Sequence, residues 1–191
     1  MADGLPSILV QNAELVGTLA TMISLFIYRN LAGNWPLLSE FRRNTLPFLH
    51  EVIMEPAGGY AAREQYSREL VGTYDVTLSE LHDKLRSHNK IYPNNFASIK
   101  YKDEINDKSE VVRHYETSSW AHREGGLTGD TQTHLMVYRN NDDTVSIYSH
   151  YELNPIPHPV AHYKGDGDTW SIKKGVENGK KIMEDFELVE V

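Results

Sequence analysis

Apolar residues recur at helical spacing in a nearly uncharged segment near the N-terminus. Between Gly4 and Tyr28 the only charged residue is Glu14. The face opposite the apolar stripe is small and weakly polar, so the pattern predicts a helix that packs on both sides. We expect this helix, with the tryptophan that follows it, to make subunit or partner contacts through Leu15, Gly17, Leu19, Thr21, Met22, Ile23, Phe26 and Trp35.

The same segment has the length of a membrane span. Glu14 and several polar residues interrupt it, and a carboxylate near the bilayer centre costs about 2.5–3.5 kcal/mol on insertion scales. Asp3 also places an acid where a secretory signal peptide carries basic residues. We therefore expect neither a membrane span nor secretion by a signal peptide.

Further helices are expected up to residue 88. Gly and Pro at 33–36 end the first helix, and helical patterns follow over 37–54, 61–71 and 77–88. Thr77 and Glu80 have the spacing of a capping box at the start of the third. The pair of short helices around residues 72–76 allows a helix-turn-helix DNA-binding regulator, although the second helix has no excess of basic residues for a phosphate backbone.

After residue 95 the pattern changes from helix to strand. Runs rich in β-branched and aromatic residues at 96–101, 111–117, 133–138 and 144–151 predict two hairpins, and an apolar stripe over 171–186 predicts a last helix. The expected fold class is α+β. It comprises an N-terminal helical region, 1–76, and a domain, 77–191, built as an α-β-β-β-β-α two-layer sandwich with an antiparallel sheet.

Composition removes several classes of function. The 191 residues include no cysteine, which excludes disulfides, a Cys-ligated metal and a thiol nucleophile. The net charge of −8 opposes non-specific binding to nucleic acid, which depends on neutralising phosphates. Since no catalytic signature or cofactor motif is present, we expect no catalytic residues, no cofactor and no small-molecule substrate.

Histidines carry the remaining candidate chemistry. Six of the nine lie between His114 and His162. Three histidines and a carboxylate suit zinc, iron or manganese, whereas hydrogen bonds across a half-buried sheet would explain the same residues without a metal. The candidate metal ligands are His134, His150, Glu152, His158 and His162.

Residues 78–163 resemble small uncharacterised proteins of haloarchaea and their tailed viruses. The resemblance rests on Leu78-x-x-Leu81-x-x-x-Leu85, Asn95-Phe96-Ala97-Ser98-Ile99-Lys100-Tyr101, Ser119-Trp120-Ala121-His122-Arg123-Glu124, Thr133-His134-Leu135-Met136-Val137, Tyr148-Ser149-His150-Tyr151-Glu152 and His158-Pro159-x-x-His162-Tyr163. It implies a component of a virus particle or of its assembly, located in the virion or the cytoplasm.

The first helix and this resemblance together predict a non-enzymatic structural or assembly protein. We expect a head, neck or tail component of a tailed virus that associates with itself and with other structural proteins. Two alternatives remain open at this point. One is a metal-dependent hydrolase or nuclease that uses the histidine cluster, and the other is the helix-turn-helix regulator.

Overall fold

The structure is a computed structural model that describes residues 41, 44–49, 62–95, 97–140, 142–164 and 169–191. The helix expected between Gly4 and Tyr28 and its candidate interface residues, through Trp35, lie outside these described residues and stay predictions. Within the described part of the chain, no helix combines the length and the apolar character that a membrane crossing requires.

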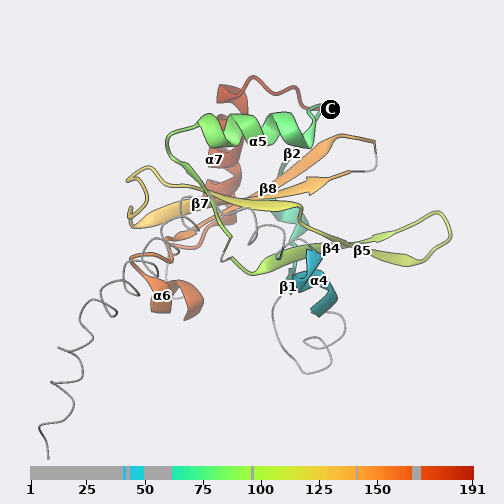
Figure 1. Cartoon of the computed structure of the whole chain (residues 1–191), viewed down its shortest axis with the longest axis horizontal. Helices are drawn as coiled ribbons and strands as arrows, with labels where there is room; N and C mark the ends of the chain where they lie inside the picture. Colours follow the sequence, from blue (N-terminus) through green and yellow to red (C-terminus); the bar gives the residue numbers. More distant parts are fainter. Residues whose placement is uncertain (1–40, 42–43, 50–61, 96, 141, 165–168) are drawn as a thin grey trace, which may run out of the picture.

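The described chain contains helices and two β-sheets (Figure 1), which confirms the α+β fold class. Its helices are α4 (Leu46–Leu49), the 3-10 helix η2 (Ser67–Glu69), α5 (Leu78–Ser87), α6 (Pro159–Lys164) and α7 (Ile172–Asp185). Its strands are β1 (Ala62–Glu64), β2 (Leu70–Tyr74), β3 (Ile91–Pro93), β4 (Ile99–Ile105), β5 (Val111–Tyr115), β6 (Ser118–His122), β7 (Thr131–Arg139) and β8 (Val145–Leu153).

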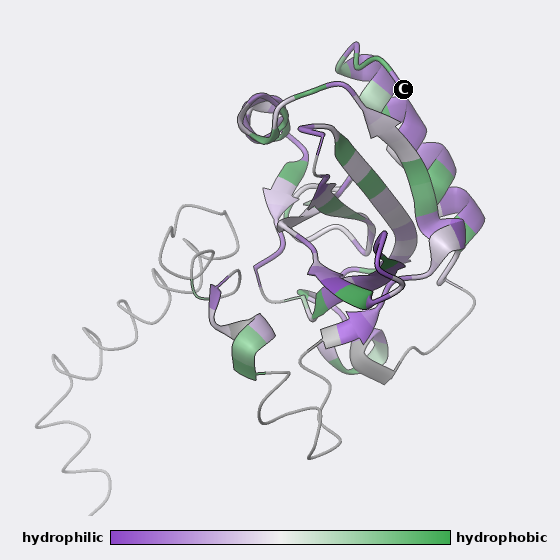
Figure 2. Cartoon of the chain, turned by 90° about the vertical axis from the view of Figure 1, so that its right-hand side faces the viewer, coloured by the Kyte–Doolittle hydropathy of each residue, from purple (hydrophilic) through white to green (hydrophobic). Residues whose placement is uncertain are grey.

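The larger sheet has five strands in the order β2-β8-β7-β6-β3, and all its neighbours are antiparallel. Helices α5 and α7 cover one of its faces (Figure 1). Leu81 and Leu85 from α5 and Met183 from α7 are buried there against Leu135 and Ile147 of the central strands. Figure 2 shows hydrophobic and less hydrophobic residues alternating along the strands of this curved sheet, as a sheet with two different faces requires.

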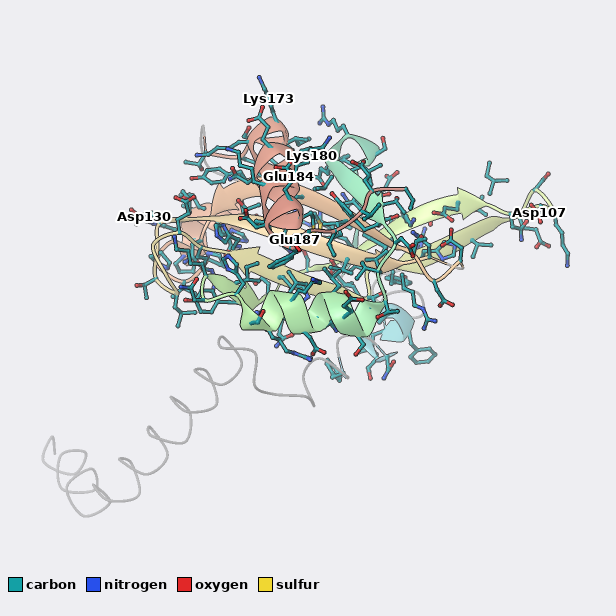
Figure 3. All side chains as sticks on the ribbon, turned by 90° about the horizontal axis from the view of Figure 1, so that it is seen from above. Asp107, Asp130, Lys173, Lys180, Glu184 and Glu187 are labelled. Carbon is teal, nitrogen blue, oxygen red and sulfur yellow. The ribbon has the colours of Figure 1, made fainter. Side chains whose placement is uncertain are left out.

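The smaller sheet has the order β1-β4-β5, in which β1 and β4 are parallel and β4 and β5 form a hairpin. The hairpin projects from the body of the molecule, with Asp107 at its far end (Figures 1 and 3). The two sheets share one bend at Glu116. Its N–H donates to the carbonyl of Lys100 in the smaller sheet, whereas the N–H of Thr117 donates to Val137 in the larger one.

Two parts of the predicted layout are wrong. The helix expected over 61–71 is, in its described part, β1, η2 and the start of β2. Leu70 is 42 % exposed and its neighbour Val71 only 2 %, and this alternation of exposed and buried side chains is typical of a strand. The partner of β2 is β8, which lies far along the chain. A helix-turn-helix needs a helix in this segment. In its described residues the structure therefore lacks the motif on which the DNA-binding alternative depended.

The single four-stranded sheet is also wrong, because the two expected hairpins belong to different sheets. The bend at Glu116 starts β6, which pairs with β7 and leaves β4 and β5 to pair with β1. Strands β1 and β2 precede residue 77 and yet belong to the two sheets, so both sheets draw on residues from both sides of that position.

Helix boundaries were predicted more accurately. The hydroxyl of Thr77 accepts a hydrogen bond from the N–H of Glu80 (3.2 Å) and caps α5. Ser171 caps α7 in the same way through the N–H of Lys174 (3.2 Å). Both caps satisfy amides that lack partners in the first helical turn.

Candidate metal centre

Strands β7 and β8 bring three of the five predicted ligands together. His134 and His150 are register partners, and Glu152 is paired with Gln132 one step further along the same strands. Because side chains alternate across a strand, all four project from the same face of the sheet. This face is opposite to the one that packs on α5 and α7, where Leu135 lies.

The ligand atoms of the three residues are spaced as a metal ion would space them. Nδ1 of His134 lies 3.3 Å from Nε2 of His150. Glu152 places one oxygen 3.5 Å from His134 Nδ1 and the other 3.3 Å from His150 Nε2. A tetrahedral ion with bonds of about 2.0–2.2 Å separates its ligand atoms by about 3.3–3.6 Å. The two histidine nitrogens therefore have the spacing of two ligands of such an ion, and one ligand atom from each of the three residues lies within 4.8 Å of the others.

Each of the three residues has a further polar partner besides the other two. Nε2 of His134 lies 2.6 Å from the hydroxyl of Ser119, and Nδ1 of His150 lies 3.2 Å from a carboxylate oxygen of Glu69. The amide of Gln132 donates to Glu152 (2.7 Å). Outer partners of this kind, above all a carboxylate on a histidine, fix the orientation of metal ligands.

The outer partners are themselves supported. Arg123 donates from Nε to the amide oxygen of Gln132 (2.9 Å), so that the Gln132 side chain is oriented with its NH₂ group toward Glu152. The side-chain amide of Gln65 donates to Glu69. Glu69 is fully buried and Arg123 nearly so. The cluster is thus a continuous polar network enclosed between the larger sheet and the segment around η2.

His162 lies beside the cluster and His158 does not. In α6, Nδ1 of His162 is 2.7 Å from the carbonyl of Leu153 and 3.6 Å from Glu152. Since a carbonyl only accepts, we assign the ring hydrogen to Nδ1, which leaves Nε2 as an acceptor. His158 precedes α6 and instead lies 3.2 Å from the carboxylate of Asp130. The two histidines therefore do not share a face.

The network places a cationic histidine between two carboxylates. Burial by itself would lower the pKa of His150, but the hydrogen bonds and charges of Glu152 and Glu69 outweigh it and raise this pKa to about 9. Burial would raise the pKa of Glu152, and its contacts with His150 and the other two histidines instead hold this pKa far below its usual range. The cluster thus attracts positive charge strongly.

Helix α7 supports the cluster from the other face of the sheet. A Cβ on Gly175 would lie 2.2 Å from the Cα of His150, and one on Gly179 would lie 2.6 Å from the side chain of Val71. Only glycine permits this approach of the helix to β8. The two glycines set the distance between α7 and the strand that carries two of the three ligands.

Sequence reasoning missed Glu69, Ser119, Gln132 and Arg123. Gln132 could have been found only with a longer strand, because the predicted run began at residue 133 and β7 begins at Thr131. Glu69 gave no usable signal, since its segment resembles a helix. His134, His150, Glu152 and His162 also line one cleft of 910 Å³ that opens between the two sheets.

Comparison with protein-family models, with curated proteins and with solved structures gave no match. The resemblance to haloarchaeal and viral proteins therefore stays an expectation from the sequence. The chemistry of this site has to be inferred from its own residues and geometry.

Proposed function

We propose that the protein binds a divalent transition-metal ion through His134, His150 and Glu152 and uses it for hydrolysis. One observation carries this proposal. Nδ1 of His134 and Nε2 of His150 lie 3.3 Å apart, each lies 3.3–3.5 Å from a different oxygen of Glu152, and each of the three residues has a further polar partner. Two histidines with one carboxylate, and further positions open to water or substrate, are typical of catalytic zinc and iron sites.

A metal ion in such a site lowers the pKa of a coordinated water and so supplies a nucleophile near neutral pH. The chain contributes the remaining groups. His162 lies beside Glu152 and lines the cleft, and this chain would use it to accept a proton from a metal-activated water. Ser119, Glu69 and Gln132 keep the three ligands in place, so that little reorganisation is required when the ion binds.

Metal content tests the first half of the proposal. The full chain is purified, treated with EDTA and dialysed, and then titrated with Zn²⁺ or Mn²⁺ under calorimetric detection, followed by elemental analysis of the loaded protein. We expect one ion per chain. His134→Ala and Glu152→Gln are expected to abolish this binding, while circular dichroism and thermal unfolding report whether each variant folds.

His158→Ala is the matched control, because His158 belongs to the same stretch of sequence and lies outside the cluster. It should retain the ion. Hydrolysis of a chromogenic phosphate ester by the loaded protein, lost in His134→Ala and kept in His158→Ala, tests the second half. If folded wild-type protein takes up no ion, the cluster is an ionic hydrogen-bonded network and the proposal is wrong.

The structural or assembly role expected from the sequence is a second proposal, and one feature of the fold supports it. Ile105, Val111 and Val112 are exposed on the projecting β4–β5 hairpin, and among the described strands β5 is the last of its sheet and pairs only with β4. Edge strands of this kind pair with a second copy of the same chain. This role would be supported if the protein forms a concentration-dependent oligomer and Val111→Asp makes it monomeric. A strictly monomeric wild-type protein would contradict it.

A further inference from the structure

Cations and carboxylates both line the cleft above the proposed metal centre. The cations are Arg63, Arg68 and Lys100, and the carboxylates are Glu64, Glu69 and Glu152. Arg63 of β1 and Lys100 of β4 are register partners, so both side chains leave the smaller sheet on the same face. Both side chains can donate charge-assisted hydrogen bonds to an anion bound in the cleft.

Lys100 is the most informative of these cations, because it is only 9 % exposed and yet lines the cleft. Its Nζ lies 5.9 Å from the ring centroid of Tyr66, and the guanidinium carbon of Arg68 lies 5.6 Å from the same centroid. A buried ammonium is stable only with compensating charge or hydrogen bonds. Lys100 and Arg68 thus both approach the ring of Tyr66, and their N–H groups are donors suited to the oxygens of a phosphate.

Two aromatic side chains stand exposed at the same cleft. Tyr66 is 50 % exposed and Trp170 is 44 % exposed, and both line the cleft. The indole of Trp170 lies 6.0 Å from the ring of His150, measured between centroids. Exposed aromatic faces of this kind stack on planar rings, and such stacking is worth about 1–3 kcal/mol per nucleic-acid base.

We propose that the cleft binds a small phosphate ester that carries a planar ring, with a nucleotide as the simplest example. This rests on the proposed hydrolytic function and adds its substrate class. The phosphate lies between Lys100, Arg68 and the metal centre, and the ring lies on Trp170 or Tyr66. The volume of 910 Å³ falls within the range of about 300–1,000 Å³ that is usual for small-molecule sites.

The net charge decides between a small ester and a long polyanion. At −8, the whole protein repels a nucleic-acid strand, whose binding grows with the number of phosphates that are neutralised. A few cations within one cleft suffice for one or two phosphates.

In the hydrolysis, the water oxygen bonds to phosphorus, the bond from phosphorus to the ester oxygen breaks, and the proton lost by water ends on the departing alcohol.

The probes are adenosine monophosphate, adenosine and inorganic phosphate, titrated into the metal-loaded full chain by calorimetry. We expect the nucleotide to bind at least about 10-fold more tightly than either fragment, because it alone makes both charge-assisted and stacking contacts. Lys100→Gln and Arg68→Gln should each weaken it by about 10-fold, and Trp170→Ala by a similar factor. Lys102→Gln should leave it unchanged, since Lys102 pairs with Glu104 (2.7 Å) and lies over Tyr138.

The outcomes separate this inference from the function on which it rests. The proposed substrate class is wrong if adenosine binds as tightly as the nucleotide, even when the metal is bound. It is also wrong if Lys100→Gln and Arg68→Gln bind the nucleotide as tightly as the wild type. Nucleotide binding that follows the expected pattern in protein that takes up no metal would support the cleft assignment and refute the hydrolytic function. Nucleotide binding equal in Lys102→Gln and Lys100→Gln would contradict the proposed position of the phosphate.

Discussion

A carboxylate oxygen of Glu69 lies 3.2 Å from Nδ1 of His150, and both side chains are buried. The two residues come from η2 and β8, which are distant in sequence. A carboxylate behind a metal-ligating imidazole fixes the ring and increases its basicity. In the proposed metal site Glu69 is therefore a positioning residue that acts through His150.

Glu69→Gln should weaken metal binding without abolishing it. The amide keeps the size of the side chain but removes the charge behind His150, and the loss of such a partner typically lowers metal affinity about 10–100-fold. Competition titration with a chelating dye measures this. Glu64→Gln is the control, because Glu64 also lines the cleft but belongs to no contact in the cluster. Equal affinity in Glu69→Gln and wild type would contradict this role.

Ser119→Ala separates two chemistries that share His134. Ser119, His134 and Glu152 are connected in the order of a serine-hydrolase triad, with contacts of 2.6 and 3.5 Å. Ser119 is buried, and we assign it to holding the ring of His134. The variant should retain hydrolysis at saturating metal and lose about 10-fold in metal affinity. Complete loss of hydrolysis in a folded, metal-loaded Ser119→Ala protein would instead assign the nucleophile to the serine.

Gly175→Ala should destabilise the protein although alanine favours helices. In an exposed helix this change would stabilise by about 1 kcal/mol. Here the new Cβ would lie 2.2 Å from the Cα of His150, so α7 must move away from β8, at a cost of about 1–3 kcal/mol. Urea unfolding measures whether the free energy of unfolding falls or rises. Lys173→Ala is the control, since Lys173 projects from α7 into solvent (Figure 3), and a stabilised Gly175→Ala would refute the close packing.

The metal-free protein should lose stability as the pH rises above neutrality. The pKa of His150 is raised from 6.5 to about 9 on folding, so its protonation stabilises the fold fully below pH 6.5 and this contribution is lost as the pH passes 9. The lowered pKa of Glu152 stabilises above its unfolded value and is lost in acid. The thermal unfolding temperature of the EDTA-treated protein should therefore be highest between about pH 4.5 and 6.5.

His150→Gln isolates the histidine from the other groups that titrate in base. Its unfolding temperature should fall less between pH 7 and 10 than that of the wild type, whereas His158→Gln should follow the wild type. Parallel curves for His150→Gln and wild type would show that His150 does not hold the proton.

The chain's local signals were sufficient for the elements that are stabilised locally. The cap at Thr77 and the hairpins β4–β5 and β7–β8 depend on residues close in sequence, and all three are present. The pattern over 61–71 misled because its strands β1 and β2 gain their hydrogen bonds from β4 and β8. Tertiary pairing overrides local preference in such segments.

The candidate site divides in the same way. His134, His150 and Glu152 could be predicted as neighbours, because the period of a strand and the pairing of one hairpin place them on one face. His158 could not be separated from His162 by spacing alone. Its position depends on where α6 begins, at Pro159, and on the contact with Asp130.

The sequence by itself determined the α+β class, the cap at Thr77 and the hairpin that carries the three candidate ligands, because each depends on alternation or capping over a few residues. Only the tertiary structure decided that Glu69 and Ser119 stand behind those ligands, and that Lys100 and Trp170 line the same cleft. These residues lie outside the β7–β8 hairpin, and their positions depend on the packing of other segments against it, which local pattern does not specify.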